Sequence, residues 1–315
     1  MPQAAGRKPG PQLKPHHGSM QGPERKRPAF LRPRGANRRS PMTNAVRNEV
    51  AAPTASSREE DPLLQEFTYP SMFGPAKVFA LETEDGTPVR VLYVGGGFQS
   101  ATFLGERRFQ PVFAYYRALD ALFQADLNHE RLLLIGGGGY SYPKHLLTTR
   151  DHTAIDVVEI DPAVIQIARD HFFLDEIEAQ HGPAGTNRLR SFAQEGLTFL
   201  ESAPNATYSA VINDSFDGTA PTAHLLSDHA LEQAKRCLIP NGLYLLNLVV
   251  DEDPEDPQAQ ALAQRTLESV RSALTGAFSH VFEQLCVDEE IGGADNHLFV
   301  ATDGPHSFEG FEPIS

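Results

Sequence analysis

The sequence is poor in several residue types, and each shortage excludes a class of protein. Its 315 residues contain no Trp, four Met and two Cys. Cys237 and Cys286 lie far apart in segments that read as a helix and a strand, so we expect reduced core residues and no disulfide framework. No apolar run approaches the roughly 20 residues of a membrane span, and no apolar segment follows the basic N-terminus as in a secretory signal. The sequence therefore predicts a cytoplasmic protein with no membrane partner.

Positive charge is scarce beyond the first 50 residues. The chain carries 27 Lys and Arg against 41 Asp and Glu, and 11 of those basic residues fall within residues 1–50. This basic, Pro- and Arg-rich stretch has little apolar surface, so we predict a disordered tail over residues 1–62. The acidic remainder argues against a nucleic-acid-binding face outside that tail. The 12 His residues show no repeated ligand spacing, so we expect no metal site.

The remaining sequence has enough apolar content, 40% over the whole chain, to bury a core. Short β-rich runs separated by turn signals predict a small antiparallel unit between about residues 64 and 104. From residue 131 onward strands and helices alternate, which predicts a mostly parallel sheet closed by an antiparallel C-terminal end. The expected organisation is a tail (1–62), a small N-terminal β domain (63–108), a Rossmann-like α/β domain (109–305) and a C-terminal tail (306–315).

A glycine run, "LLLIGGGGYSYP", ends the first strand of the alternating part. Glu159, in "VVEIDP", follows Gly136 by 23 residues and ends the next strand, where a carboxylate can accept hydrogen bonds from ribose hydroxyls. The pair predicts a site for a nucleoside-containing cofactor. A tight turn followed by a helix-capping acid is the alternative. A second run, Gly95–Gly97 in "LYVGGGFQS", has a similar composition.

Two further strand ends carry acids. Glu195 lies in "AQEGLTFL", and Asp214 and Asp217 lie in "VINDSFDG". Two carboxylates three residues apart can face one pocket, where one orients a cationic amine and the other takes its proton. The same residues are equally well suited to turns and caps, so the spacing leaves both interpretations open.

In this order and spacing, "LLLIGGGGYSYPKHL", "DVVEIDPAVIQIARDHF", "AQEGLTFL" and "VINDSFDG" resemble the spermidine synthase (polyamine aminopropyltransferase) family, in its divergent bacterial spermidine synthase-like branch. The resemblance implies the sheet of class I S-adenosylmethionine-dependent methyltransferases, preceded by a small β-rich domain. It implies a transferase that moves an aminopropyl group from decarboxylated S-adenosylmethionine to an amine such as putrescine, in polyamine biosynthesis, without a metal. It also implies a homodimer.

The resemblance assigns a role to each matched residue. Residues that the resemblance assigns to the donor are Gly136, Gly137, Gly138, Glu159 and Glu195, with Glu159 on the ribose and Glu195 near the adenine. Gly139 and Tyr140 continue the same loop and are also expected at the donor, with simple packing an equal alternative for Tyr140. Residues expected to bind the amine substrate are Gln99, Tyr115 and Asp217, and Asp214 is the expected catalytic base. On the same match Gly95–Gly97 becomes a hairpin turn that presents Gln99.

The sequence departs from the family pattern at Gly139. Typical members have an aspartate there, facing the amine of the transferred group, and this acid repels the carboxylate of intact S-adenosylmethionine. Without the acid that discrimination is lost. Gly139 therefore favours one alternative to aminopropyl transfer, an S-adenosylmethionine-dependent methyltransferase of the same fold. A noncatalytic nucleoside-binding regulatory protein is a further alternative.

Overall fold

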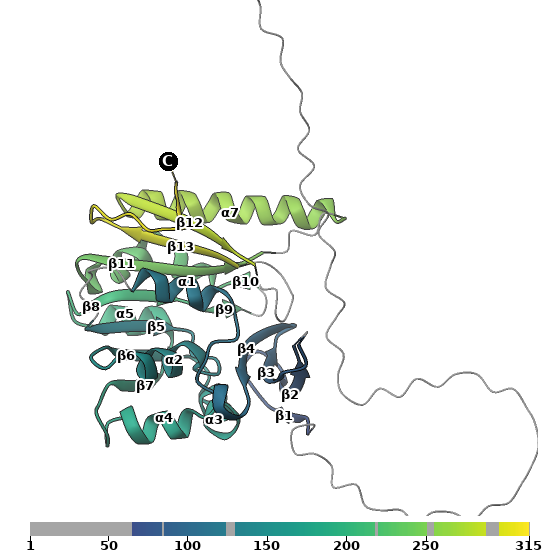
Figure 1. Ribbon diagram of the computed structural model, residues 1–315. Coiled ribbons are helices and arrows are strands. Elements are labelled where there is room, and N and C mark those ends of the chain that lie inside the picture. Colours follow the sequence, from purple (N-terminus) through teal and green to yellow (C-terminus); the bar gives the residue numbers. More distant parts are fainter. Residues whose placement is uncertain are drawn as a thin grey trace, which may run out of the picture.

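The computed structural model describes residues 65–83, 85–123, 130–217, 220–250, 255–287 and 296–314. The tail expected over residues 1–62 lies outside these ranges. The described chain forms a small sheet and a large sheet that lie side by side (Figure 1). Within these ranges no helix has the length and apolar character needed to cross a bilayer.

The small sheet is antiparallel and contains the strands β1 (Phe67–Tyr69), β2 (Ala76–Glu82), β3 (Pro88–Val94) and β4 (Gly97–Phe103), in that order. Gly95 and Gly96 connect β3 to β4 with φ angles of 63° and 96°. A two-residue hairpin loop of this kind needs positive φ at both positions, which glycine adopts without strain. The predicted hairpin turn is confirmed.

The large sheet has the strand order β14-β12-β13-β11-β8-β5-β6-β7. Its strands are β5 (Arg131–Ile135), β6 (Ala154–Glu159), β7 (Leu189–Ala193), β8 (Tyr208–Asn213), β11 (Leu238–Val249), β12 (His280–Cys286), β13 (Asn296–Thr302) and β14 (Glu312–Ile314). Neighbours from β7 to β11 pair in parallel, whereas β12, β13 and β14 pair antiparallel. The predicted α/β sheet with an antiparallel C-terminal end is confirmed. Within the expected C-terminal tail (306–315), the strand β14 hydrogen-bonds to β12, so this part of the segment belongs to the large sheet.

Helices cover both faces of this sheet (Figure 1). They are α1 (Tyr115–Leu122), α2 (Ser141–Thr149), α3 (Pro162–His171), α4 (Leu174–His181), α5 (Gly196–Ser202), α6 (Asp228–Cys237) and α7 (Pro257–Ala277). Short elements complete the chain: the 3-10 turns η2 (Gly105–Arg107) and η3 (Ala223–Leu226), and a small ribbon of β9 (Phe216–Asp217) and β10 (Ala220–Pro221).

The core has one apolar layer on each face of the large sheet. Leu132 and Leu134 of β5 pack into the layer that contains side chains of α1, α2, α3 and α4. Leu133 and Ile135 pack into the opposite layer, with α5, α6 and α7. This alternation follows from the two-residue period of a strand. Cys237 and Cys286 are buried and free, as predicted.

The small sheet packs on α3, beside the end of β6. Buried residues of β2 and β3 form a cluster with Val164, Ile167 and Phe172. Asp161 joins the two parts: it caps α3 by accepting from the Ala163 amide (2.9 Å), and it accepts from the Met72 amide (2.7 Å). The small sheet is thereby fixed close to the glycine run that follows β5.

Candidate functional site

The glycine run Gly136–Gly139 connects β5 to α2 and packs against the end of β8. Gly136 has a φ of 98°, and a Cβ atom built on it would lie 2.1 Å from the carbonyl oxygen of Asp214. Gly138 has a φ of 50°, and a Cβ atom there would lie 3.2 Å from the carbonyl oxygen of Gln99. Side chains would block these approaches, so the glycines let the loop touch the backbone just after β8 and the backbone of β4.

Glu159 ends β6 with 8% of its surface exposed, and its carboxylate binds the backbone of the glycine loop. Oε2 accepts from the amides of Gly137 (2.9 Å) and Gly138 (3.2 Å), and Oε1 accepts from the amide of Asp161 (3.0 Å). Burial raises the pKa of Glu159, and the three amide hydrogen bonds oppose that rise. Each carboxylate oxygen has two lone pairs, so Oε1 keeps one for a further donor such as a ribose hydroxyl.

Asp214 follows β8, an interior strand, and is partly buried at the carboxyl end of that strand. Its Oδ2 accepts from the Tyr115 hydroxyl (2.8 Å), and its Oδ1 accepts from Nδ2 of Asn247 (2.8 Å). Burial raises the pKa of Asp214, while hydrogen bonds from Asn247, Tyr115 and Tyr116 act in the opposite direction. The structure thus brings together Asp214, Tyr115 and the glycine loop, three features far apart in the sequence.

Two asparagines of this site were missed by the sequence analysis. Asn247 lies in β11 with 2% of its surface exposed, and Asn296 begins β13 with 9% exposed. Nδ2 of Asn296 donates to Oδ1 of Asn247 (2.9 Å). The available signal was a lone amide in the apolar run "YLLNLVV", because a buried polar side chain needs a hydrogen-bond partner.

Gln99 lies in β4 against the glycine loop. Its backbone carbonyl faces Gly138, and its Nε2 donates weakly to the Val94 carbonyl (3.4 Å). The hairpin of β3 and β4 therefore places Gln99 at the same loop as Glu159. Its predicted contact with the amine substrate stays a prediction.

Tyr140 and Gly139 face the protein interior. Tyr140 adopts a φ of 55°, and its fully buried ring lies 3.0 Å from the position of a Cβ atom at Gly137. The side chain thus packs within the protein against Gly137, and its predicted contact with the donor stays a prediction. A Cβ atom at Gly139 would lie 2.7 Å from both the Phe172 ring and Oγ of Ser100. Neighbouring side chains thus fill the space that an acid would need.

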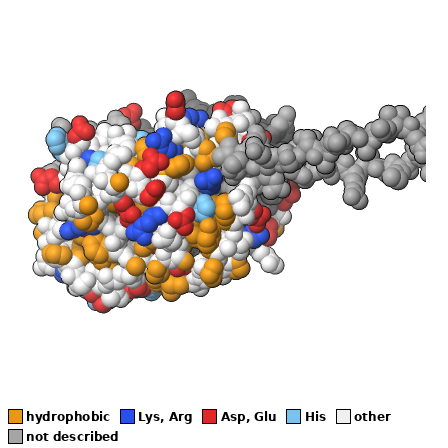
Figure 2. Space-filling view, turned by 90° about the horizontal axis from the view of Figure 1, so that it is seen from below, with side chains coloured by type: hydrophobic (Ala, Val, Ile, Leu, Met, Phe, Trp, Pro, Cys, Tyr) orange, Lys and Arg blue, Asp and Glu red, His pale blue; other side chains and the backbone are white. Residues whose placement is uncertain are grey.

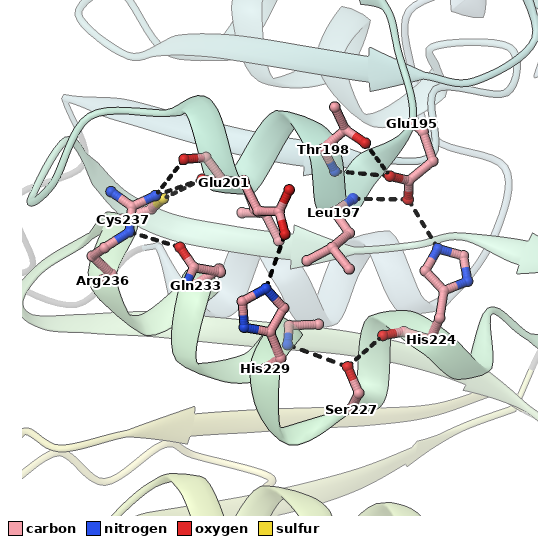
Figure 3. Close-up of polar contacts among 12 residues, drawn as sticks. Glu195, Leu197, Thr198, Glu201, His224, Ser227, His229, Gln233, Arg236 and Cys237 are labelled. Carbon is pink, nitrogen blue, oxygen red and sulfur yellow. Dashed lines mark hydrogen bonds and ion pairs between the residues drawn. The ribbon is translucent and has the colours of Figure 1, made fainter.

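Glu195 caps α5 (Figure 3). Its carboxylate accepts from the amides of Leu197 and Thr198, both at 2.8 Å, and from Nε2 of His224 (2.9 Å). Burial favours a higher pKa, but these hydrogen bonds outweigh it and lower the pKa of Glu195 to about 2. The carboxylate therefore has a structural role at the start of α5, and its predicted contact with adenine stays a prediction.

Asp217, the second predicted carboxylate of "VINDSFDG", is the last residue of β9. Its side chain is outside the described part of the structure. Among the residues that are described, no group of three or more His, Cys, Asp or Glu side chains is arranged to hold a metal ion.

A glycine loop and an acid at successive parallel strand ends, with helices on both faces, define a Rossmann-like protein of the class I S-adenosylmethionine-dependent methyltransferase type. The model of the spermine/spermidine synthase domain matches residues 113–283, more than half of the chain. The chain belongs to this family.

Curated relatives match part of the chain. Spermidine synthase 1 of Hyoscyamus niger is 32% identical over 116 residues, which cover 37% of this chain and 35% of the relative. Polyamine aminopropyltransferase of Prochlorococcus marinus (strain MIT 9313) is 28% identical over 142 residues, covering 45% of this chain and 46% of the relative. The matched region thus covers less than half the length of each of these relatives.

Solved structures share the fold over a larger part of the chain. A probable spermidine synthase from Corynebacterium glutamicum superposes with a TM-score of 0.60 at 19% identity, covering 78% of this chain and 82% of that chain. Spermidine synthase from Thermotoga maritima gives a TM-score of 0.57 at 17% identity, covering 78% and 75%. At such identities the likeness concerns the fold.

Proposed function

We propose that the protein transfers an aminopropyl group from decarboxylated S-adenosylmethionine to an amine acceptor such as putrescine. The observation that carries this proposal is the contact between Gly136 and the backbone of Asp214. This contact supports the proposal because the residue whose carboxylate we propose as the base lies next to the loop expected to hold the donor. Membership of the spermine/spermidine synthase family supports the same reaction.

The reaction is an in-line displacement at the carbon next to a sulfonium. An ammonium proton passes to Asp214, and the freed nitrogen lone pair attacks the carbon. The C–N bond forms as the C–S bond breaks, its electron pair goes to sulfur, and 5′-methylthioadenosine leaves. The protein contributes alignment of the two reactants and removal of the proton. Glu159 and the glycine loop would hold the donor, and Tyr115, Gln99 and Asp217 the amine.

The space around Gly139 favours a second candidate, a methyltransferase that uses intact S-adenosylmethionine. Gly139 supplies no carboxylate, and the ring of Phe172 and Oγ of Ser100 occupy the direction that its side chain would take. Without a carboxylate at position 139, the side chain that would repel a donor carrying a carboxylate is missing there.

Binding and product analysis distinguish these candidates. The purified protein is titrated with S-adenosylmethionine, its decarboxylated form and 5′-methylthioadenosine, and turnover is followed with putrescine and other diamines. Tighter binding of the decarboxylated donor, with release of 5′-methylthioadenosine, is expected. Tighter binding of the intact donor with a methylated product would instead establish the second candidate. Ligand binding without any product would indicate the noncatalytic alternative.

On the side seen in Figure 2, acidic and basic side chains are interspersed and form no continuous basic face. A small-molecule amine is the partner that we propose. The homodimer implied by the resemblance and the cytoplasmic location predicted from the sequence are part of the proposal. Sedimentation velocity of the purified protein tests the first, and fractionation of cells that produce the tagged protein tests the second.

A further inference from the structure

Two buried asparagines continue the hydrogen bonding of Asp214 into the large sheet. Asn247 of β11 pairs with Leu298 of β13, two residues beyond Asn296. The two asparagine side chains therefore lie diagonally on one face of the sheet, close enough to interact. Asn296 donates to Asn247 (2.9 Å), and Asn247 donates to Oδ1 of Asp214 (2.8 Å).

The two hydrogen bonds are linked through the side-chain amide of Asn247. A primary amide can present either its oxygen or its NH2 group to a neighbour. An ionised carboxylate only accepts, so the amide of Asn247 turns its NH2 group toward Asp214 and its oxygen toward Asn296, whose donation supports this orientation. Oδ1 of Asp214 therefore always faces a donor. Oδ2 faces the hydroxyl of Tyr115 (2.8 Å), which can donate or accept.

We propose that Asn296 and Asn247 are positioning residues that direct the proton of the attacking amine to Oδ2 of Asp214. This inference rests on the proposed function. A proton on Oδ1 would point at the hydrogens of Asn247, whereas a proton on Oδ2 is accommodated when the Tyr115 hydroxyl turns to accept. In the reaction the N–H bond of the ammonium breaks, the O–H bond forms on Oδ2, and the nitrogen lone pair becomes free to attack.

The hydrogen bond from Asn247 should have a measurable effect on the pKa of Asp214, because few other titratable groups of the described structure face this carboxylate. The titratable side chains that face Asp214 in the described structure are the phenols of Tyr115 and Tyr116, both from α1. On the β5 side its neighbour is the backbone of Gly136, and on the β11 side it is the uncharged Asn247. Burial raises the pKa of Asp214 and the hydrogen bond from Asn247 lowers it. Losing that hydrogen bond must therefore raise the pKa further.

The test measures the ionisation of Asp214 in Asn247→Leu, in Asn296→Leu and in the double variant. Two readouts are used: the acid limb of the pH profile of kcat/KM for 5′-methylthioadenosine release, and the 13C resonance of the Asp214 carboxyl, assigned with Asp214→Asn. Asn247→Leu should raise the midpoint by about one pH unit or more, the scale of a hydrogen bond to a charged group. Asn296→Leu, which does not touch Asp214, should give a smaller rise.

The double variant is the decisive arm. Asn296 is expected to act through Asn247, so Asn296→Leu should add no shift in the Asn247→Leu background. Tyr244→Phe is the matched control: it removes a buried hydrogen bond to Asn213 from the same strand, without contact to Asp214, and should leave the midpoint unchanged. If Asn296→Leu does not fold, Asn296→Ser, too short to reach Asn247, replaces it.

The proposal is overturned if Asn247→Leu leaves the midpoint unchanged, or if the effect of Asn296→Leu persists in full beside it. A failure of the proposed function is recognised separately. If the unmodified protein releases no 5′-methylthioadenosine with any amine, aminopropyl transfer is wrong, and the carboxyl resonance still decides whether the two asparagines control the ionisation of Asp214.

Discussion

At the residue scale, Asp214 and Gly136 form the contact on which the site depends. We expect substitution of Asp214 to reduce turnover and substitution of Gly136 to reduce stability. Asp214→Asn keeps the shape of the side chain and removes its basicity. We expect binding of the decarboxylated donor to survive and turnover to fall by roughly 10²-fold or more, the usual scale for losing a general base. Calorimetric titration and a 5′-methylthioadenosine assay measure the two quantities. Asp170→Asn, on α3, is the control. Unchanged turnover would show that Asp214 is a turn residue.

Gly136→Ala is expected to lower the stability of the folded protein. The backbone at residue 136 has a φ of 98°, and the new methyl group would overlap the carbonyl oxygen of Asp214. We expect a loss of about 1–3 kcal/mol in the free energy of unfolding, measured with urea. Gly276→Ala in α7 is the control, because nothing lies within 4 Å of its Cβ position. Equal stabilities of the two variants would contradict the described loop.

The sequence predicted which residue types stand at the strand ends, but not how they contact one another. Glu159 and Asp214 could be located because an acid after a glycine-marked or apolar strand is visible in the chain. The role of Asn247 could not, since its partners lie on β13 and after β8. The reason for glycine at position 139 also depends on tertiary packing, because Phe172 comes from the end of α3 and Ser100 from the small sheet.

At the element scale, α5 depends on its capping carboxylate. Glu195→Gln keeps the size of the side chain but loses the charge that faces the first amides of the helix. The folded-state pKa of Glu195, about 2, lies below its value in an unfolded chain, about 4.3. The stabilisation is therefore fully present above about pH 4.3 and is lost as the pH falls through about 2.

We accordingly expect the unmodified protein to exceed Glu195→Gln in stability by about 1 kcal/mol at neutral pH. This difference should shrink between pH 4.5 and pH 2, as measured by thermal unfolding. Glu201→Gln, at the other end of the same helix, is the control (Figure 3). A difference that stays constant over this pH range would contradict the capping role.

The order of elements was predictable from period and spacing, whereas the last edge strand was not. Alternating apolar runs and helical patterns identified the parallel strands, because each buries both of its faces. The short strand β14 has no such pattern: its residues are Glu312, Pro313 and Ile314, and it forms because the edge of β12 is available. Pairing of this kind is decided by the partner strand.

At the scale of the whole molecule, the small sheet and the large sheet meet around Lys144. Lys144 is 1% exposed, and its ammonium donates to the carbonyl of Phe172 (2.6 Å), just after α3, and to the hydroxyl of Thr102 (3.3 Å), in β4. One side chain of α2 therefore holds both parts. Nearby, Tyr69 of β1 hydrogen-bonds His171 (2.5 Å), so the contact extends along α3.

Lys144 makes the stability of this assembly depend on pH. Burial lowers the pKa of Lys144 to about 7, and the charge of Glu176 opposes that change in part. Between about pH 7 and pH 10.4 the unfolded chain holds a proton that the folded protein has released, so stability rises with pH across this window, by at most about 1.4 kcal/mol per unit. Below pH 7 the folded protein carries the full cost of a buried ammonium.

Lys144→Met removes the titration but also the two hydrogen bonds, so the prediction concerns the pH dependence of the difference. Relative to Lys144→Met, the unmodified protein should gain stability steadily from pH 7 to pH 10 in urea unfolding. Lys77→Met, at a half-exposed lysine of β2, is the control and should show no such trend. A constant difference across the window would mean that Lys144 stays charged where the two sheets meet, and that its contacts with Phe172 and Thr102 outweigh the cost of burying it.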